Sequence, residues 1–179
     1  MLTTEFLPRN RFNEYGHWLK AQDPETIREY FGWPLNNDGI DSLIEKWHQQ
    51  PTQNYFLVAK CNNFWAGTIH IATHENSVEF GIIVALHYRK QGIASYMMEE
   101  AITWARNRFY SNLYMHCIRS NQAIKKLCEK HDLKIKSMMG DSEGNLALPP
   151  PTPLTYLQEH ARTSQQNWDR LLRMSQFTF

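Results

Sequence analysis

The sequence has no long run of apolar residues and no excess charge of either sign. No stretch approaches the ~20 consecutive apolar residues that a membrane-spanning helix needs, and residues 1–20 lack the apolar core of a secretion signal. The net charge of +1 gives no general reason to expect nucleic acid or an anionic membrane as a partner. We expect one soluble domain, because 179 residues with 42% apolar content suffice for a single core.

Cysteine is also scarce, and its spacing excludes two common uses. Cys61, Cys117 and Cys128 are widely separated and form no Cys-x-x-Cys pair. An odd number at such spacing is typical of reduced thiols, rather than of a disulfide framework or a zinc knuckle. The histidines add no ligand spacing suited to a metal site. We therefore expect a cytoplasmic protein without a bound metal.

The apolar residues that are present follow helical and strand periods in turn. Helices are predicted from Asp23 to Gly32, over 37–50, over 93–109 and over 121–131, and strands over 54–60, 64–73, 77–84, 112–118, 133–139 and 145–149. The turn between the first two strands falls at Asn62 and Asn63, and a glycine-bearing turn joins the last two. This order predicts a mixed α/β fold.

The strand predicted over 77–84 contains an internal glycine, Gly81, next to an alternating apolar pattern. Its alternate residues Val78, Phe80, Ile82 and Val84 share one face, which leaves Glu79, Gly81 and Ile83 on the other. A glycine inside a strand suggests a bulge, or close approach by another backbone or a ligand.

The nonapeptide "HYRKQGIAS" (87–95) joins that strand to the next helix. A helix that begins at Gly92-Ile93 presents unpaired backbone N–H groups, and Gly92 allows a ligand to approach them because it has no Cβ. Arg89 and Lys90 add cations that suit the same anion. The sequence thus predicts a phosphate site here, with an ordinary basic strand-to-helix turn as the alternative.

The form of this motif points to one superfamily. It is neither Gly-x-x-x-x-Gly-Lys-Ser/Thr nor Gly-x-Gly-x-x-Gly. Instead, Arg89-x-x-Gly92-x-Ala94 resembles the pyrophosphate-binding motif of the GCN5-related N-acetyltransferase (GNAT) superfamily. Residues 119–133 are similar to the second signature of that superfamily, and "DSEGNLALPP" resembles a segment of an uncharacterised bacterial branch.

The resemblance spans residues 20–148 and implies a fold and a domain division. It implies a central, mostly antiparallel mixed sheet, twisted and flanked by helices. We expect an acetyltransferase domain over 1–148, followed over 149–179 by a proline-rich connection and a C-terminal amphipathic helix.

The resemblance also implies acetyl-CoA as cosubstrate and assigns residues to it. Its pantetheine arm would follow the strand end at Ile82, Ile83 and Val84, and its pyrophosphate would lie on the backbone of Arg89, Lys90, Gln91, Gly92, Ile93, Ala94 and Ser95. Asn121 would anchor pantetheine or a water molecule, or it simply caps a helix. The 3′-phosphate could meet some of the cations Arg106, Arg108, Arg119, Lys125, Lys126, Lys130, Lys134 and Lys136, although a solvated helix face explains most of them.

Direct acetyl transfer to an amine needs a base and an acid. Glu79 is the candidate base, with an ion pair or a solvated strand position as the alternative. At the position where many members carry an acidic tyrosine, this chain has Cys128, which either donates the proton or packs in the core. Tyr96 and Tyr114 are other candidates for the acid.

The acceptor is expected near the first two helices. Tyr30, Phe31 and Trp33 either line its pocket or form core beneath a loop. The function favoured is an acetyl-CoA-dependent N-acetyltransferase acting on a primary amine. The alternatives are a non-catalytic acyl-CoA-binding module and a member directed to nucleic acid.

The proline-rich segment "LPPPTP" (148–153) separates a last helix from the rest. This helix begins at Thr152-Pro153, and its apolar stripe comprises Leu154, Leu157, Ala161, Trp168, Leu171 and Leu172. Such a stripe requires cover, either by its own domain or by a second copy in a homodimer. Membrane contact is less favoured because the other face mixes both charge signs.

Overall fold

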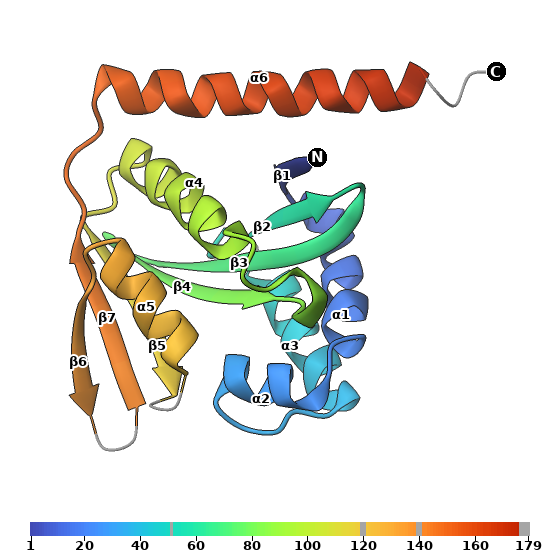
Figure 1. Cartoon of the computed structure of the whole chain (residues 1–179), viewed down its shortest axis with the longest axis vertical. Helices are drawn as coiled ribbons and strands as arrows, with labels where there is room; N and C mark the ends of the chain where they lie inside the picture. Colours follow the sequence, from blue (N-terminus) through green and yellow to red (C-terminus); the bar gives the residue numbers. More distant parts are fainter. Residues whose placement is uncertain (51, 119–120, 139–140, 176–179) are drawn as a thin grey trace.

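The computed structural model describes residues 1–50, 52–118, 121–138 and 141–175 (Figure 1). The strands are β1 (Leu2–Phe6), β2 (Asn54–Cys61), β3 (Phe64–His74), β4 (Ser77–Val84), β5 (Asn112–Ile118), β6 (Lys134–Met138) and β7 (Asp141–Ala147). The helices are α1 (Phe12–Lys20), α2 (Pro24–Phe31), α3 (Asn37–Gln49), α4 (Ile93–Asn107), α5 (Gln122–Lys130) and α6 (Pro153–Ser175), with short 3-10 turns at Arg9–Arg11 and Leu86–Tyr88.

The seven described strands form one sheet in the order β1-β2-β3-β4-β5-β7-β6. All neighbouring pairs are antiparallel except β4 and β5, which run parallel. The β4–β5 ladder extends only from Ser77↔Asn112 to Glu79↔Tyr114, whereas β4 stays paired with β3 as far as Val84. The two central strands therefore diverge after Glu79, and the mixed, mostly antiparallel sheet predicted from the sequence is confirmed.

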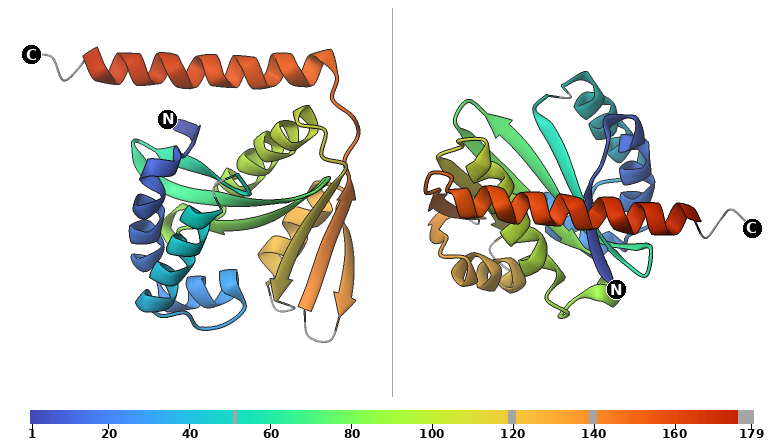
Figure 2. Two further views of the ribbon diagram at one scale, coloured as in Figure 1. Left: turned by 180° about the vertical axis from the view of Figure 1, so that it is seen from behind. Right: turned by 90° about the horizontal axis from the view of Figure 1, so that it is seen from above.

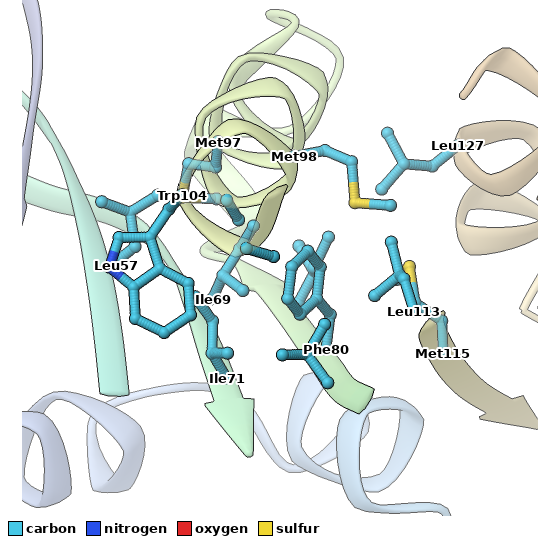
Figure 3. Close-up of a cluster of buried hydrophobic side chains, with 14 of the residues drawn as sticks. Leu57, Ile69, Ile71, Phe80, Met97, Met98, Trp104, Leu113, Met115 and Leu127 are labelled. Carbon is cyan, nitrogen blue, oxygen red and sulfur yellow. The ribbon is translucent and has the colours of Figure 1, made fainter. Parts of the chain in front are cut away.

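Helices cover both faces of the sheet (Figures 1 and 2). On one face, α4 and α5 cover a cluster that includes Ile69, Phe80, Met97 and Leu113 (Figure 3). On the other face, a second cluster formed with α1, α2 and α3 includes Tyr15, Ile44 and Phe56. Strands β2 and β4 contribute alternate residues to both clusters, which is why their sequences read as nearly continuous apolar runs.

The glycine inside β4 does not mark a bulge. The β3–β4 register runs without a shift through His70↔Gly81, so that part of the sequence prediction is wrong. The alternative was close approach by another backbone or a ligand, and what approaches Gly81 in the structure is instead a side chain. A Cβ on Gly81 would lie 2.9 Å from the hydroxyl of Tyr30, which reaches the sheet from α2.

Two other predictions need correction. The sequence patterns missed β1 and α1, which pack as the sheet edge and as part of the second cluster. The segment 141–144, taken as a turn, belongs to β7, where Gly144 pairs with Met115 and Ile135. A glycine is needed there because a Cβ would lie 2.9 Å from the sulfur of Cys128. The remaining residue of the predicted turn, Gly140, lies outside the described part of the chain.

The last helix, α6, lies along one edge of the molecule across α4 and β1 (Figures 1 and 2). It packs on its own domain, as one of the two sequence alternatives proposed, but through its polar face. Thr155 is buried, whereas Leu154, Leu157 and Trp168 are exposed. The side chains of Leu171 and Leu172 lie outside the described part. None of the described helices is both long and apolar enough to cross a membrane.

Candidate cofactor and acceptor site

A cleft of about 630 Å³ opens where β4 and β5 diverge. Its floor is the end of β4, at Ile82, Ile83 and Val84. One side, which we call the α4–α5 wall, comprises Lys90, Gly92, Ile93, Ala94, Ser95, Asn121, Gln122, Ala123, Ile124, Lys126, Leu127 and Lys130. The other side, the α2 wall, comprises Thr26, Glu29 and Tyr30, and Tyr88 and Arg89 also line the cleft.

The first turn of α4 presents its backbone to this cleft. Gly92 is the N-cap and has φ +80°, a conformation that glycine adopts without strain. The first intrahelical bond runs from the Tyr96 N–H to the Gly92 carbonyl at 3.0 Å, so the amides before Tyr96 have no acceptor within the helix. A Cβ on Gly92 would meet no described atom within 4 Å. The helix N-terminus is therefore open to an anion, as the sequence predicts.

The side chains around Gly92 have different roles. Lys90 lines the cleft with a left-handed backbone (φ 62°). Gln91 does not line it, since its amide donates to the His87 carbonyl at 3.2 Å. Arg89 turns toward α2, where its guanidinium donates to the Thr26 hydroxyl at 2.6 Å and lies 3.4 Å from the Glu29 carboxylate. Its Nε also donates to the Val84 carbonyl at 3.2 Å. Arg89 thus ties the phosphate motif to the α2 wall.

Two polar contacts fix the α4–α5 wall. The Ser95 hydroxyl lies 2.9 Å from His131 Nε2, which links the first turn of α4 to the end of α5. Burial lowers the pKa of His131, so the ring is neutral at neutral pH. Asn121 lines the cleft and caps α5, because its Oδ1 accepts from the Ile124 N–H at 3.2 Å. Asn121 therefore has the helix-capping role considered from the sequence, and it also lies where the proposed cofactor contact would be made.

Tyr30 is the aromatic residue of α2 that reaches the cleft. Its hydroxyl lies 3.1 Å from that of Tyr15, and its pKa is raised well above the ordinary value, by burial first and then by Tyr15 and the charge of Glu79. Phe31 and Trp33 were predicted beside Tyr30, but neither lines the cleft. Phe31 packs between the rings of Tyr30 and Trp33, and Trp33 is 57% exposed.

The two proposed catalytic groups lie outside the lining of the cleft. Glu79 occupies the last paired position of β4 and β5, opposite Tyr114, and is half-buried on the face that α2 covers. Cys128 is 1% exposed and belongs to the core cluster under α4 and α5. Of the two alternatives for Cys128, its position matches packing in the core. A proton donor to a ligand in the cleft would have to be exposed there, and this thiol is not. Tyr96 faces Arg162 of α6, 5.6 Å from ring centre to guanidinium carbon, rather than the cleft.

Few of the predicted phosphate-binding cations reach the cleft. Lys126 and Lys130 line it. Arg106 instead donates to the carbonyls of Pro149 and Pro150, both at 3.0 Å, and Arg108 pairs with Glu159 at 2.9 Å. Arg119 lies outside the described residues.

Sequence reasoning missed several lining residues. Glu29 and Tyr30 stand three and four positions after Thr26, so the three residues lie on the same side of α2. That spacing is a signal that could have grouped them. Nothing in the local sequence links α2 to Arg89, because the contact depends on the tertiary fold. Within the described residues, no group of three or more His, Cys, Asp or Glu side chains could hold a metal.

This arrangement was compared with known proteins. A sequence model described as "Acetyltransferase (GNAT) domain" matches residues 9–134, well over half of the chain. The chain belongs to this family. A search of curated proteins finds no match.

Solved structures share the fold of this GNAT chain at low sequence identity. The GNAT domain of PAT from S. lividans superposes with TM-score 0.70 at 14% identity, over 81% of this chain and 89% of its own. A spermidine N-acetyltransferase from Vibrio cholerae, in complex with CoA and spermine, gives 0.67 at 16% identity, over 82% and 95%. An N-acetyltransferase from Staphylococcus aureus Mu50 gives 0.62 at 19% identity, over 83% and 99%. These likenesses show the fold.

Proposed function

We propose that this GNAT protein is an acetyl-CoA-dependent N-acetyltransferase that transfers the acetyl group directly to a primary amine. The observation that carries the proposal is the open N-terminus of α4 at Gly92, which faces a cleft large enough for an extended cofactor. The family match and the CoA bound in the Vibrio cholerae structure support the same cofactor.

The residues fit the parts of acetyl-CoA. The amides of the first turn of α4 and the side chain of Lys90 suit the pyrophosphate. Lys126 and Lys130 suit the 3′-phosphate, and the unpaired edge of β4 after Glu79 suits the amide groups of pantetheine. When bound, acetyl-CoA supplies a thioester carbonyl, which a substrate amine attacks to form a C–N bond as the C–S bond breaks.

The amine must lose a proton in this reaction and the thiolate must gain one. An amine with a pKa near ~10.4 needs a base at neutral pH, and we assign this role to Glu79, acting through an ordered water because it does not line the cleft. We assign no proton donation to Cys128. We assign the acid role to the Tyr30 hydroxyl because Tyr30 lines the cleft and reaches β4 at Gly81. The acceptor would then enter along the α2 wall.

The second candidate is a non-catalytic acyl-CoA-binding module. The burial of Cys128 and the position of Glu79 outside the cleft lining favour it, because both groups proposed for proton transfer are then displaced from the bound thioester.

Two assays test the proposal and separate the candidates. Isothermal titration calorimetry with acetyl-CoA should show binding for both, whereas ATP of similar charge should bind more weakly. Thiol release from acetyl-CoA over a panel of polyamines, amino acids, peptide N-termini and aminoglycosides should occur only for an enzyme. Binding without turnover over the whole panel favours the second candidate, and absence of acetyl-CoA binding contradicts both.

A variant of the proposed base tests the mechanism once an acceptor is found. Glu79→Gln should slow turnover most at neutral and acidic pH, where the amine depends on a base, and should leave acetyl-CoA affinity intact. An unchanged pH–rate profile would remove Glu79 from the mechanism.

A further inference from the structure

Helix α6 presents large apolar side chains to solvent. Leu154 is 62% exposed, and Leu157 and Trp168 are each 66% exposed. With Ala161, which is also exposed, they share one helical face, which we call the outer stripe. Figures 1 and 2 show that α6 forms the edge of the molecule, with none of the described elements on its outer side.

The opposite face of α6 is bonded to the domain by polar groups. The Glu159 carboxylate accepts from Asn107 at 2.6 Å and from Arg108 at 2.9 Å. Gln166 donates to the buried Glu100 carboxylate at 3.1 Å. Turning the outer stripe inward would break these contacts and leave Glu100 with fewer partners in a buried site. The stripe is therefore held outward and can be covered only from outside.

Among the α6 residues whose side chains the structure describes, those that border the outer stripe carry no formal charge. They are Gln158, Ser164 and Gln165. The charged side chains described in α6, Glu159 and Arg162, lie on the inner side, where both are only partly exposed. Over these described positions, two copies of the stripe can meet without like-charge repulsion, and an anionic membrane finds no row of cations there.

We propose that α6 pairs with α6 of a second copy of this chain, antiparallel and centred on Ala161. Leu154 and Trp168 each stand seven residues from Ala161, which is two helical turns in either direction. A two-fold axis at Ala161 therefore brings Trp168 of each copy opposite Leu154 of the other. The same operation sets Leu157 opposite Gln165, whose aliphatic part can cover it.

The residue at the centre suits close packing. Alanine allows two helix axes to approach to about 8–10 Å, and Cα atoms lie about 2.3 Å from each axis. Facing Ala161 residues would thus have their Cα atoms about 3–6 Å apart, which overlaps the range of about 4.4–6.8 Å found in disulfides. This distance makes the pairing testable by cross-linking.

The size of the contact sets the expected strength. The 23 residues of α6 span about 35 Å, and a helix is about 10–12 Å wide, so the outer face has a footprint of about 400 Å². A standard interface buries about 800 Å² on each partner. We therefore expect a dimer that dissociates on dilution.

The first experiment fixes the register. Full-length Ala161→Cys should form a covalent dimer under mild oxidation, whereas Leu154→Cys should not, because position 154 faces position 168 of the other copy. The wild-type chain controls for its own thiols. The double variant Leu154→Cys/Trp168→Cys should cross-link. Cross-linking by Leu154→Cys alone, or no cross-link with Ala161→Cys, overturns the proposed pairing.

The second experiment measures assembly. Sedimentation velocity over a dilution series should show a reversible monomer–dimer equilibrium for the wild-type chain, and Leu154→Glu or Trp168→Glu should shift it at least about tenfold toward monomer. His160→Glu adds the same charge at an exposed position of α6 off the stripe and should leave the equilibrium unchanged. A wild-type monomer at every concentration, or a dimer that the stripe variants do not weaken, contradicts the proposal. Monomer that sediments with lipid vesicles would assign the stripe to a membrane instead.

Discussion

The two walls of the cleft use different chemistry. The α4–α5 wall offers backbone amides at Gly92–Ser95 and the side chains of Lys90, Lys126 and Lys130. The α2 wall is a network of side chains that connects different elements. Arg89 bonds Thr26, 63 residues away, and Tyr30 bonds Tyr15 of the preceding helix. An anion can be bound by a short local motif, whereas the surface proposed to face the acceptor depends on contacts between different elements. Ligand binding at the α4–α5 wall should therefore be sensitive to changes in the backbone. The stability of the α2 wall should be sensitive to the loss of side-chain contacts.

The largest effect is expected at the backbone of the α4–α5 wall. Gly92→Glu should weaken acetyl-CoA binding at least about a hundredfold, because it places a carboxylate in the anion site and strains a residue with φ +80°. Calorimetry checks this. Gln91→Glu is the matched control, since Gln91 does not line the cleft, and its affinity should stay within about threefold of the wild type. Retained affinity in Gly92→Glu would place the pyrophosphate elsewhere.

On the face of the sheet that α2 covers, His70 should make the protein sensitive to acid. Burial lowers its pKa from 6.5 to about 3, so the unfolded chain binds a proton that the folded protein excludes. The protein is therefore most stable, as far as His70 is concerned, above the pKa that His70 has in the unfolded chain. This stability is lost as the pH falls toward the pKa of His70 in the folded protein. Between about pH 7 and pH 4 the loss should reach about 3 kcal/mol.

A variant isolates this contribution of His70. His70→Gln keeps a donor for Asn54, whose Oδ1 lies 2.8 Å from His70 Nε2, and should lose less stability in acid than the wild type. Urea unfolding at both pH values measures the difference. His131→Asn, in the α4–α5 wall, is the comparison and should show a smaller effect, because His131 is less buried than His70. Equal acid losses in wild type and His70→Gln would contradict the assignment.

A smaller effect is expected where Tyr30 touches the sheet. Gly81→Ala should destabilise the protein by about 1–2 kcal/mol, although alanine normally suits a strand better than glycine. The reason is the contact of 2.9 Å that its Cβ would make with the Tyr30 hydroxyl. The penalty should shrink in a Tyr30→Phe background, where that oxygen is absent. Thermal unfolding of the four proteins measures this coupling, and a stabilising Gly81→Ala would contradict it.

The smallest effect on binding distinguishes the two walls most sharply. Arg89→Gln should keep acetyl-CoA affinity within about threefold of the wild type, because its guanidinium contacts Thr26, Glu29 and Val84 rather than the backbone amides of the first turn of α4. It should instead speed hydrogen exchange in α2 by releasing that helix. A large affinity loss with unchanged exchange in α2 would make Arg89 a phosphate ligand.

The same division explains what the sequence could predict. The strand alternation around Phe80, the turn at Asn62-Asn63 and the start of α4 at Gly92 all follow from local periodicity and backbone preference. These features suffice for the mixed α/β class and the open helix N-terminus, whereas the mostly antiparallel sheet was implied by the resemblance to the GNAT superfamily.

What the sequence could not predict depends on distant contacts. Gly81 could not be assigned to Tyr30, nor Arg89 to α2, because those partners lie about 50 or more residues away along the chain. Cys128 aligns with a plausible catalytic position, but it is buried in the core cluster under α4 and α5, beside Gly144. The sequence pattern identifies the outer stripe of α6 as apolar, but the direction it faces depends on tertiary contacts such as those of Glu159 and Gln166.

The central claim is that the amides of the first turn of α4 bind the pyrophosphate of acetyl-CoA. The most direct measurement is an amide chemical-shift titration of the wild-type protein with acetyl-CoA. The largest shifts should fall on Gly92 to Ser95, with smaller ones along Ile82 to Val84. Saturable binding that leaves the amides of Gly92 to Ser95 unshifted would contradict the claim.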